Sequence, residues 1–282
     1  MPELPEVETV RRGLEQQLSH FRIERVEVLR DRAIAFPPDP TAFCDALVGC
    51  AVGGWERRGK YLLGSLSREP GSAAGVWGVH LRMTGQFRWL NAPCPPCPHT
   101  RVRLWNASGQ ELRFVDIRSF GQMWWVPPDL ATEAVITGLA RLGPEPFSPE
   151  FNATYLQARL QGSMRPIKNA LLDQGLLAGV GNIYADEALF AAGIIPHQPS
   201  GRLSLLQLEA LQRAIVAVLE LSIGAGGTTF SDFRDLTGTN GNYGGLAWVY
   251  RRGGDPCRRC GTTIRRDRLA GRSTHWCPGC QH

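Results

Sequence analysis

The chain has 282 residues, of which 43% are hydrophobic and 20% charged, and it carries a formal net charge of +5. At about 100–200 residues per domain, this length predicts two domains, and the composition excludes a disordered chain. No apolar run approaches the roughly 20 residues of a membrane-spanning helix, and three glutamates stand in the first eight residues where a signal peptide would be basic and apolar, so we expect an intracellular protein.

The first half of the chain predicts one helix followed by a β-rich domain. Pro5 suits the first turn of a helix over 5–18, in which apolar residues from Val7 to Leu18 recur at helical spacing. The period then changes to two, and short segments rich in β-branched, leucine and tryptophan residues predict strands over 23–29, 60–66, 76–83, 86–90, 101–106, 110–117 and 121–126. This pattern is typical of a β-sandwich or a barrel.

The second half returns to a helical period after a proline-rich break. Helices are predicted over 152–160, 167–174, 182–192 and 204–222, the last with a capping box of Ser204 and Gln207. Residues 224–245 are rich in glycine and have no clear period, so a functional loop is expected there. We therefore predict an α+β fold with a domain over 1–135, a linker over 136–150, a helical domain over 151–250 and a tail over 251–282.

Four of the eight cysteines have the spacing of a metal site: Cys257, Cys260, Cys277 and Cys280. Two residues separate the members of each pair, and sixteen separate the pairs. This spacing predicts a zinc ribbon with one structural Zn²⁺, whose four sulfur ligands leave no open position for catalysis; free thiols are the alternative. A third pair, Cys94 and Cys97, lies in the proline-dense loop 91–99 and lacks a fourth ligand, so free thiols are expected there.

The tail is strongly basic. Residues 251–282 hold eight arginines against two aspartates and carry +6, which leaves −1 for the first 250 residues. Such a block favours an anionic partner such as nucleic acid, with a solvated tail as the alternative. Lys60 and Lys168 are the only lysines in the chain, so each is a candidate for a role that needs a compact, deprotonatable amine.

The N-terminal residues have a chemical interpretation. If Met1 is removed, Pro2 presents a secondary amine that can add to an aldehyde-like carbon and form an iminium, with Glu3 near enough in sequence to move protons. The alternative is that Pro2 and Glu3 only begin the helix.

Eight short motifs follow one another along the chain: PELPEVETVRRGL at 2–14, GKYLL at 59–63, HLRMTG at 80–85, DIRSFG at 116–121, DQGLLAGVGNIYADEALF at 173–190, GGTTFSDF at 226–233, CRRCG at 257–261 and GRSTHWCPGCQ at 271–281. In order and spacing they resemble the formamidopyrimidine-DNA glycosylase family over essentially the whole chain. The resemblance implies a monomeric bacterial DNA repair enzyme of the cytoplasm and nucleoid. It would excise oxidised purines (8-oxoguanine and formamidopyrimidines) from double-stranded DNA and then cleave the strand by β,δ-elimination.

The fold that the resemblance implies is an N-terminal β-sandwich flanked by helices, followed by a helix-two-turn-helix domain and a zinc finger, with 224–245 as a loop over the lesion. Pro2 would attack C1′ of the damaged nucleotide and form the iminium. Glu3 would act as general acid and base, supported by Glu6. Lys60 would assist β-elimination and Arg272 δ-elimination. A solvated turn is the alternative for Lys60, and phosphate anchoring is a second role for Arg272.

The DNA-binding residues that the resemblance implies are His99, Arg118, Ser163, Lys168, Asn182, Met83 and Phe120. Met83 and Phe120 would fill the space left by the extruded base while Arg118 reads the orphaned cytosine; core packing is the alternative for both apolar residues. Ser163 stands where a DNA-contacting lysine is expected, and Arg159 and Arg165 lie nearby in sequence as candidates to replace that lysine.

Two other functions are compatible with this scaffold. One is the related endonuclease VIII type, which prefers oxidised pyrimidines; Leu4 and the complete trio of Met83, Arg118 and Phe120 favour the purine branch. The other is a non-catalytic binder of damaged DNA. The intact N-terminal proline and glutamate argue against a binder, since binding alone requires no N-terminal amine.

Overall fold

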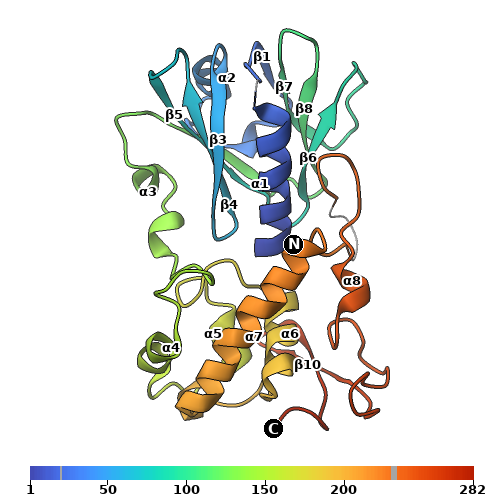
Figure 1. Cartoon of the computed structure of the whole chain (residues 1–282). Coiled ribbons are helices and arrows are strands. Elements are labelled where there is room, and N and C mark those ends of the chain that lie inside the picture. The colour runs from blue at the N-terminus through green and yellow to red at the C-terminus, as the bar shows by residue number, and fades with distance from the viewer. Residues whose placement is uncertain (20, 230–233) are drawn as a thin grey trace. The chain divides into compact units, whose positions relative to one another are not determined.

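Strands make up most of the first half of the chain and helices most of the second, in agreement with the change of period in the sequence (Figure 1). The computed structural model describes residues 1–19, 21–229 and 234–282. These residues divide into two compact units: unit 1 comprises Met1–Ala140 and Gly226–Asn242, and unit 2 comprises Arg141–Ala225 and Tyr243–His282. Within the described ranges, no helix is long and apolar enough to cross a membrane.

Unit 1 is built from two β-sheets and short helices. Its strands are β1 (Arg25–Val28), β2 (Ile34–Phe36), β3 (Ala51–Arg58), β4 (Tyr61–Ser67), β5 (Ala73–His80), β6 (Gly85–Leu90), β7 (Thr100–Trp105), β8 (Glu111–Asp116) and β9 (Gln122–Val126). Its helical segments are α1 (Leu4–Leu18), η1 (Asp31–Ala33), α2 (Pro40–Leu47) and α3 (Thr132–Val135), followed by η2 (Leu139–Arg141). One sheet has the strand order β2-β9-β5-β4-β3 and the other β1-β7-β8-β6. All seven predicted strands are present, each within three residues of its predicted ends.

The two sheets pack face to face, so unit 1 is a β-sandwich and not a barrel. Trp77 of β5 and Phe87 of β6 belong to different sheets, and their ring centroids lie 5.9 Å apart with the rings nearly perpendicular. Both side chains, together with Leu62 and Phe114, are buried in one apolar core. Removing this apolar surface from water is the main stabilising contribution to the unit.

Helix α1 packs on β3 and β4 with the apolar face that its spacing predicts (Figure 1). The four apolar residues of that face are buried in the sandwich core: Val7, Val10, Leu14 and Leu18. The helix begins after Glu3, which forms a capping box with Glu6, and Pro5 lies in the first turn. A capping box satisfies backbone N–H groups that have no partner within the helix, so the N-terminal end of α1 is well defined.

Several elements lie where the sequence predicts none, among them β3, β2 and α2. The register of β3 with β4 shifts between Val52 and Gly54, and this bulge hides the alternation of a strand. The second, β2, has only three residues and pairs in parallel with β9. The third, α2, is short and begins after Asp39, whose carboxylate accepts the N–H of Thr41 at 2.9 Å. Short or bulged elements leave only a weak pattern in the sequence, and tertiary contacts stabilise them.

The helices predicted for the second half are all present in unit 2. Its elements are α4 (Ala153–Leu160), α5 (Ile167–Leu171), α6 (Asn182–Ala192), η3 (Ser200–Arg202), α7 (Leu205–Gly224), α8 (Tyr243–Leu246), β10 (Arg265–Leu269) and β11 (Arg272–Trp276). Helix α5 ends earlier than predicted because Asp173 begins a turn, its carboxylate accepting the N–H of Gly175 at 2.9 Å. Turns over 172–181 lead into α6, which gives the expected helix-two-turn-helix arrangement, and α6 packs against α7.

The glycine-rich segment belongs to a compact unit that its place in the chain does not indicate. The predicted domains follow chain order and put 224–245 with the helices, whereas Gly226–Asn242 is grouped with unit 1. The physical reason is hydrogen bonding over long sequence separations. The N–H of Thr228 donates to Glu6 at 2.8 Å, and the N–H of Trp89 donates to the carbonyl of Leu236 at 3.0 Å. Residues 230–233 of the predicted loop lie outside the described residues.

Gly75 in β5 is a position where the sandwich requires glycine. Its φ is +105°, and a Cβ built there would lie 2.1 Å from the carbonyl oxygen of Val126. We expect Gly75→Ala to lower the free energy of unfolding of unit 1 by about 3 kcal/mol or more, since left-handed backbone strain and steric overlap add. Urea denaturation followed by near-ultraviolet circular dichroism measures this effect.

The matched control is Gly109→Ala, where φ is +77° and no atom lies within 4 Å of the added Cβ. Only the backbone term applies there, so the expected loss is about 1–2 kcal/mol. Equal losses in the two variants would show that the contact with Val126 does not constrain the strand.

Candidate functional site

The N-terminal residues form a buried, hydrogen-bonded group in unit 1. Pro2 is buried, and Glu3 and Glu6 are only 2% and 1% exposed. The N–H of Glu3 donates to Oε2 of Glu6 at 2.8 Å, while Oε1 of Glu6 accepts the N–H of Thr228 at 2.8 Å. Glu6 thus joins the start of α1 to the glycine-rich segment.

Gly227 permits this close approach. Its φ is +79°, and a Cβ there would lie 3.1 Å from Oε1 and 3.3 Å from Cα of Glu6. A side chain at this position would therefore press on the carboxylate that supports Glu3. The structure brings Pro2, Glu3 and Glu6 together, as the N-terminal motif predicts.

Lys60 is buried and lies beside the end of β5. It follows Gly59, whose φ of +57° closes the turn between β3 and β4, and only 6% of the residue is exposed. Tyr61 pairs with His80 across the sheet. Burial, together with the charges of Arg82 and Lys60, lowers the pKa of His80 to about 3. The neighbouring imidazole is therefore neutral at physiological pH. Because Lys60 is buried, the solvated-turn alternative for this residue is wrong.

The residues predicted to probe the DNA lie on three short connections between strand ends. Met83 is half-buried in the turn between β5 and β6, and His99 is exposed just before β7. Arg118 and Phe120 are exposed in the bend after β8, where the guanidinium of Arg118 lies 4.9 Å from the centroid of the Phe120 ring. Phe120 is 38% exposed, so the core-packing alternative for this residue is wrong.

In unit 2, Lys168 does not occupy an exposed phosphate-binding position. The residue is fully buried, and its ammonium contacts Oδ1 of Asp186 at 2.6 Å, the carbonyl of Ser273 at 2.6 Å and the hydroxyl of Thr274 at 3.0 Å. An ammonium has three protons, and these three contacts can use all of them. The predicted direct phosphate contact of Lys168 is therefore not supported, and its observed contacts hold β11 beside α5 and α6.

Asn182 and Ser163 are also engaged with protein groups. Asn182 begins α6, and its Nδ2 donates to the carbonyl of Ser273 at 3.0 Å. The hydroxyl of Ser163 accepts from Ser200 at 2.9 Å, and its carbonyl accepts the N–H of Gly201 at 2.8 Å. These bonds orient both residues, and Ser163 serves the turn after α4.

Arg272 stands at the tip of the β10–β11 hairpin. It is exposed and pairs with Leu269 across the two-residue turn of Ala270 and Gly271, whose φ values are +44° and +77°. Two consecutive positive φ values are typical of the hairpin turns that match the twist of the strands. The hairpin therefore presents Arg272 to solvent on a short, defined support.

The four predicted metal ligands come together. The sulfur atoms of Cys257, Cys260, Cys277 and Cys280 all lie within 4.8 Å of one another. Two of the sulfur pairs are 3.9 Å and 3.4 Å apart, close to the roughly 3.8 Å expected for two sulfurs each 2.3 Å from a tetrahedral Zn²⁺. Hydrogen bonds from Thr262 lower the pKa of Cys260 to about 6, whereas burial raises the pKa of Cys277 and Cys280. The donor set fits one structural Zn²⁺, as the spacing predicts, and the free-thiol alternative is not supported.

Two buried carboxylates of α6, Asp186 and Glu187, were not predicted from the sequence. They hold the C-terminal residues of unit 2 in place. Asp186, besides contacting Lys168, accepts the N–H of His275 at 2.9 Å. Glu187 accepts the N–H groups of Trp248, Val249 and Tyr250 at 2.8–2.9 Å. The available signal was an Asp-Glu pair in an otherwise apolar helix, because buried carboxylates require partners.

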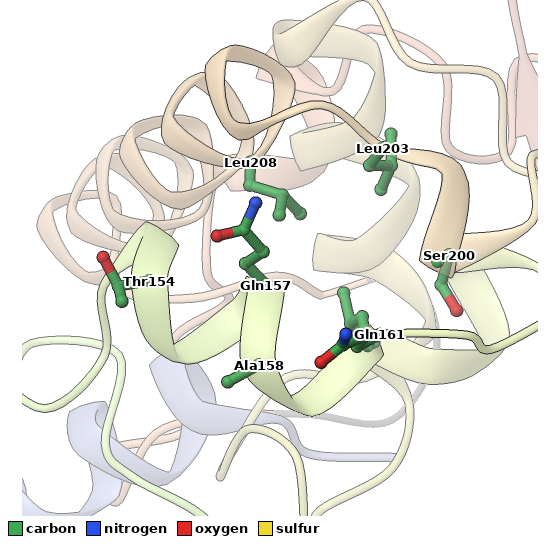
Figure 2. Close-up of a pocket in the computed structure, with 9 residues that line it drawn as sticks. Thr154, Gln157, Ala158, Gln161, Ser200, Leu203 and Leu208 are labelled. Atoms are coloured by element: carbon green, nitrogen blue, oxygen red, sulfur yellow. The ribbon is translucent and has the colours of Figure 1, made fainter.

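A cavity of about 390 Å³ lies in unit 2 (Figure 2). Its lining comes from α4, η3 and the start of α7 and includes Gln157, Leu160, Ser200, Leu203 and Leu208. None of the predicted site residues lines it. The cavity therefore contributes nothing to the assignment of the site.

The buried contact between Lys168 and Asp186 gives a stability prediction. We expect Lys168→Met to lower the free energy of unfolding of unit 2 by about 3–5 kcal/mol, because it leaves a buried carboxylate without its cation. Native-state hydrogen exchange of peptides covering β11 measures this loss.

The control is Arg165→Met, which removes a contact with Asp173 at 3.1 Å between side chains that are about half exposed. Solvent screens this pair, so the expected loss is below about 1 kcal/mol. Similar protection of β11 in the two variants would contradict the importance of the buried pair.

Zinc removal should loosen the C-terminal hairpin selectively. The apolar residues beside the cysteines, among them Phe190, Val249 and Ile264, pack as one cluster with Cys257 and Cys277. Without the ion we expect β10 and β11 to lose hydrogen-exchange protection while the strands of unit 1 keep theirs, since structural zinc supplies folding free energy locally. Cys277→Ser should lower the metal content below about one zinc per chain, whereas Cys44→Ser should not. Unchanged protection in a verified zinc-free sample would contradict the assignment.

Comparisons with known proteins cover the whole chain. Three family models match: the formamidopyrimidine-DNA glycosylase N-terminal domain over residues 1–123, the formamidopyrimidine-DNA glycosylase H2TH domain over 142–234, and the zinc finger found in FPG and IleRS over 254–282. The chain is 69% identical to the formamidopyrimidine-DNA glycosylase of Parasynechococcus marenigrum (strain WH8102) and 63% identical to that of Prochlorococcus marinus (strain MIT 9313), covering 100% of both chains in each comparison.

Solved structures agree with these matches. A Lactococcus lactis FPG mutant in complex with Fapy-dG-containing DNA has a TM-score of 0.90 and 33% identity, with 100% of both chains covered. The Lactococcus lactis FPG complex with abasic-site DNA has a TM-score of 0.89 and 33% identity over 99% of each chain. A complex of the same wild-type enzyme with oxidised-pyrimidine DNA has a TM-score of 0.89.

Proposed function

The chain belongs to the formamidopyrimidine-DNA glycosylase family and is a DNA repair glycosylase, and on this premise we propose that it excises oxidised purines from duplex DNA and cleaves the strand. The observation that carries the proposal is the buried N-terminal group in which Glu3 and Glu6 adjoin Pro2. The Lactococcus lactis relative has been seen with Fapy-dG, abasic and oxidised-pyrimidine DNA, so the lesion preference of this chain needs a direct test.

Base excision would begin at the N-terminal amine. With Met1 removed, the lone pair of the Pro2 nitrogen attacks C1′ while the glycosidic bond breaks and the base leaves with its electron pair. The proton that the Pro2 nitrogen then loses neutralises the departing base. Glu3 supplies a proton as the sugar ring opens, and the product is an iminium between Pro2 and the deoxyribose. Glu6 keeps Glu3 in place by accepting its backbone N–H, with its second oxygen held by Thr228.

Strand cleavage would follow from the iminium. The positive nitrogen acidifies the proton on C2′, and its removal expels the 3′ phosphate by β-elimination; a second elimination then expels the 5′ phosphate. Lys60 would assist the first elimination from its buried position, where a neutral His80 adds no competing positive charge. Arg272 would assist the second from the exposed tip of the hairpin.

Each unit by itself offers residues for contacts with DNA, and the basic tail is part of unit 2. Arg118, Phe120 and His99 are exposed and Met83 is half-buried, which suits residues that enter a duplex and fill the space of an extruded base. In unit 2, Asn182 and the backbone N–H groups at the start of α6 form a favourable anion site, because the helix dipole is positive there. Lys168 contributes by holding β11 beside Asn182.

Borohydride reduction in the presence of an 8-oxoguanine:cytosine duplex tests the covalent step. We expect mass spectrometry to find a DNA adduct on a Met-free Pro2 peptide in the wild-type protein. Pro2→Gly should slow adduct formation, since a primary amine replaces the proline, and Glu3→Gln should reduce base release by at least about 100-fold, the typical size of general acid–base catalysis. Both variants should retain DNA affinity.

The control is Glu24→Gln, which neutralises an exposed carboxylate outside the N-terminal group. A Glu3→Gln variant as active as this control would exclude the role of Glu3. Faster excision from a thymine-glycol duplex than from the 8-oxoguanine duplex would reject the purine preference. DNA binding without cleavage or adduct, with Met1 verified as removed, would identify a non-catalytic binder.

A further inference from the structure

One buried carboxylate connects the turns that carry Met83, Arg118 and Phe120. Asp116 is the last residue of β8 and is 1% exposed. Its carboxylate accepts the hydroxyl of Thr84 in the turn between β5 and β6. It also accepts two backbone N–H groups from the following bend: Oδ1 from Arg118 at 3.2 Å and Oδ2 from Gly121 at 2.7 Å.

Thr84 closes this arrangement. Its Oγ1 accepts the N–H of Arg118 at 3.0 Å while its own proton goes to Asp116. The hydroxyl therefore acts as donor and acceptor at once, and the turn that carries Met83 cannot shift without disturbing the bend that carries Arg118. Serine could make the same two bonds, whereas valine could make neither.

The backbone of Asp116 reaches a third segment. Its N–H donates to the carbonyl of His99 at 2.9 Å, and its carbonyl accepts from Nε of Arg101 at 2.8 Å. The connection that carries His99 is thus attached to the same residue. Three segments that are separate in sequence converge on one aspartate, and each carries a residue proposed to contact DNA.

Two residues with left-handed backbone show that this arrangement carries conformational strain. Arg82, directly before Met83, has φ +55°, and Ser119, between Arg118 and Phe120, has φ +54°. Left-handed backbone is rarely adopted by residues other than glycine and persists where the surroundings enforce it. The bonds from Arg118 and Gly121 to Thr84 and Asp116 supply it on either side of Ser119. At Arg82 the backbone N–H donates to Nδ1 of His80 at 2.9 Å.

The two turns also share a contact beneath them. A Cβ added at Gly121 would lie 2.5 Å from Cζ of Phe114, and one added at Gly85 would lie 2.8 Å from the same atom. Both backbones therefore rest directly on one aromatic ring of the core. The positions of the turns relative to each other are set by the Phe114 ring below and the Asp116 carboxylate between them.

We propose that Asp116, acting with Thr84, is a positioning residue that sets Arg118 for reading the base opposite the lesion. The inference rests on the proposed function, in which Arg118 meets the orphaned cytosine. Asp116 touches no DNA atom in this role. It acts through the backbone of Arg118, so its loss should change opposite-base discrimination more than the chemistry at C1′.

Single-turnover excision of 8-oxoguanine opposite cytosine and opposite adenine tests the proposal. Asp116→Asn is isosteric but replaces one acceptor oxygen with a donor, and Thr84→Val removes the bridging hydroxyl while keeping the shape. For both variants we expect excision opposite cytosine to fall by at least about tenfold, as buried donors lose their acceptor, and the cytosine-to-adenine rate ratio to approach unity. Thr84→Ser should restore most of that ratio.

Two further measurements separate positioning from general destabilisation and from the proposed function itself. Phe43→Leu weakens the core under α2, away from the turns, and should leave the rate ratio unchanged. Borohydride trapping on an abasic-site duplex needs no base extrusion, so Asp116→Asn and Thr84→Val should retain trapping within about threefold of wild type.

The outcomes are distinct. Proportional losses opposite cytosine and adenine, or a Thr84→Val variant with the wild-type ratio, would overturn the positioning role even if Asp116→Asn failed to fold. Equal wild-type rates opposite the two bases would overturn it as well. A wild-type protein that forms no adduct on the abasic duplex would instead reject the proposed function on which the inference rests.

Discussion

A carboxylate removed from water must find hydrogen-bond donors within the protein, because its desolvation is otherwise too costly. In unit 1 this requirement is met largely by backbone N–H groups from other parts of the chain. Glu6 accepts from Glu3 and from Thr228, which is 222 residues away in sequence, and Asp116 accepts from Arg118 and Gly121. The acceptors thereby fix the backbone of the segments on which the proposed chemistry and DNA contacts depend.

In unit 2, buried carboxylates likewise attach the C-terminal region to α6. Asp186 receives Lys168 and the backbone of His275, and Glu187 receives three successive N–H groups from residues 248–250. Burial raises the pKa of Glu187, while the three N–H donors oppose that rise by stabilising the carboxylate. The zinc site then completes a region whose apolar cluster is small. Its four ligands lie in the same C-terminal region that these two carboxylates attach to α6.

The residues proposed to react with the sugar are buried, whereas most of those proposed to contact DNA are exposed. Pro2, Glu3 and Lys60 are proposed to act on the sugar, and each is buried, which limits the positions that these groups can take. Arg118, Phe120 and Arg272 are exposed on turns, where contact with a large polyanion is possible, and the turns are kept in shape by buried hydrogen bonds behind them. Rigid support of exposed residues reduces the entropy lost when DNA is bound.

The metal site and the main strands and helices could be predicted from the amino-acid sequence, because they depend on short-range patterns. The spacing of Cys257, Cys260, Cys277 and Cys280 predicted the metal site because each pair binds through local geometry, and the periods of two and 3.6 located the main strands and helices. The eight motifs identified the family and, through it, the proposed roles of Pro2, Glu3 and Lys60. These inferences needed no knowledge of which distant segments meet.

Which polar groups share a site is evident from the folded chain and not from local patterns. Lys168 could be read as a phosphate ligand until its partners Ser273 and Thr274, 105 and 106 residues further along the chain, were seen to enclose it. Thr84 and Asp116 likewise gained their meaning from a contact across 32 residues, and Gly226–Asn242 joined unit 1 through bonds to Glu6 and Trp89. Hydrogen bonds between buried groups depend on the fold as a whole, and no local period records them.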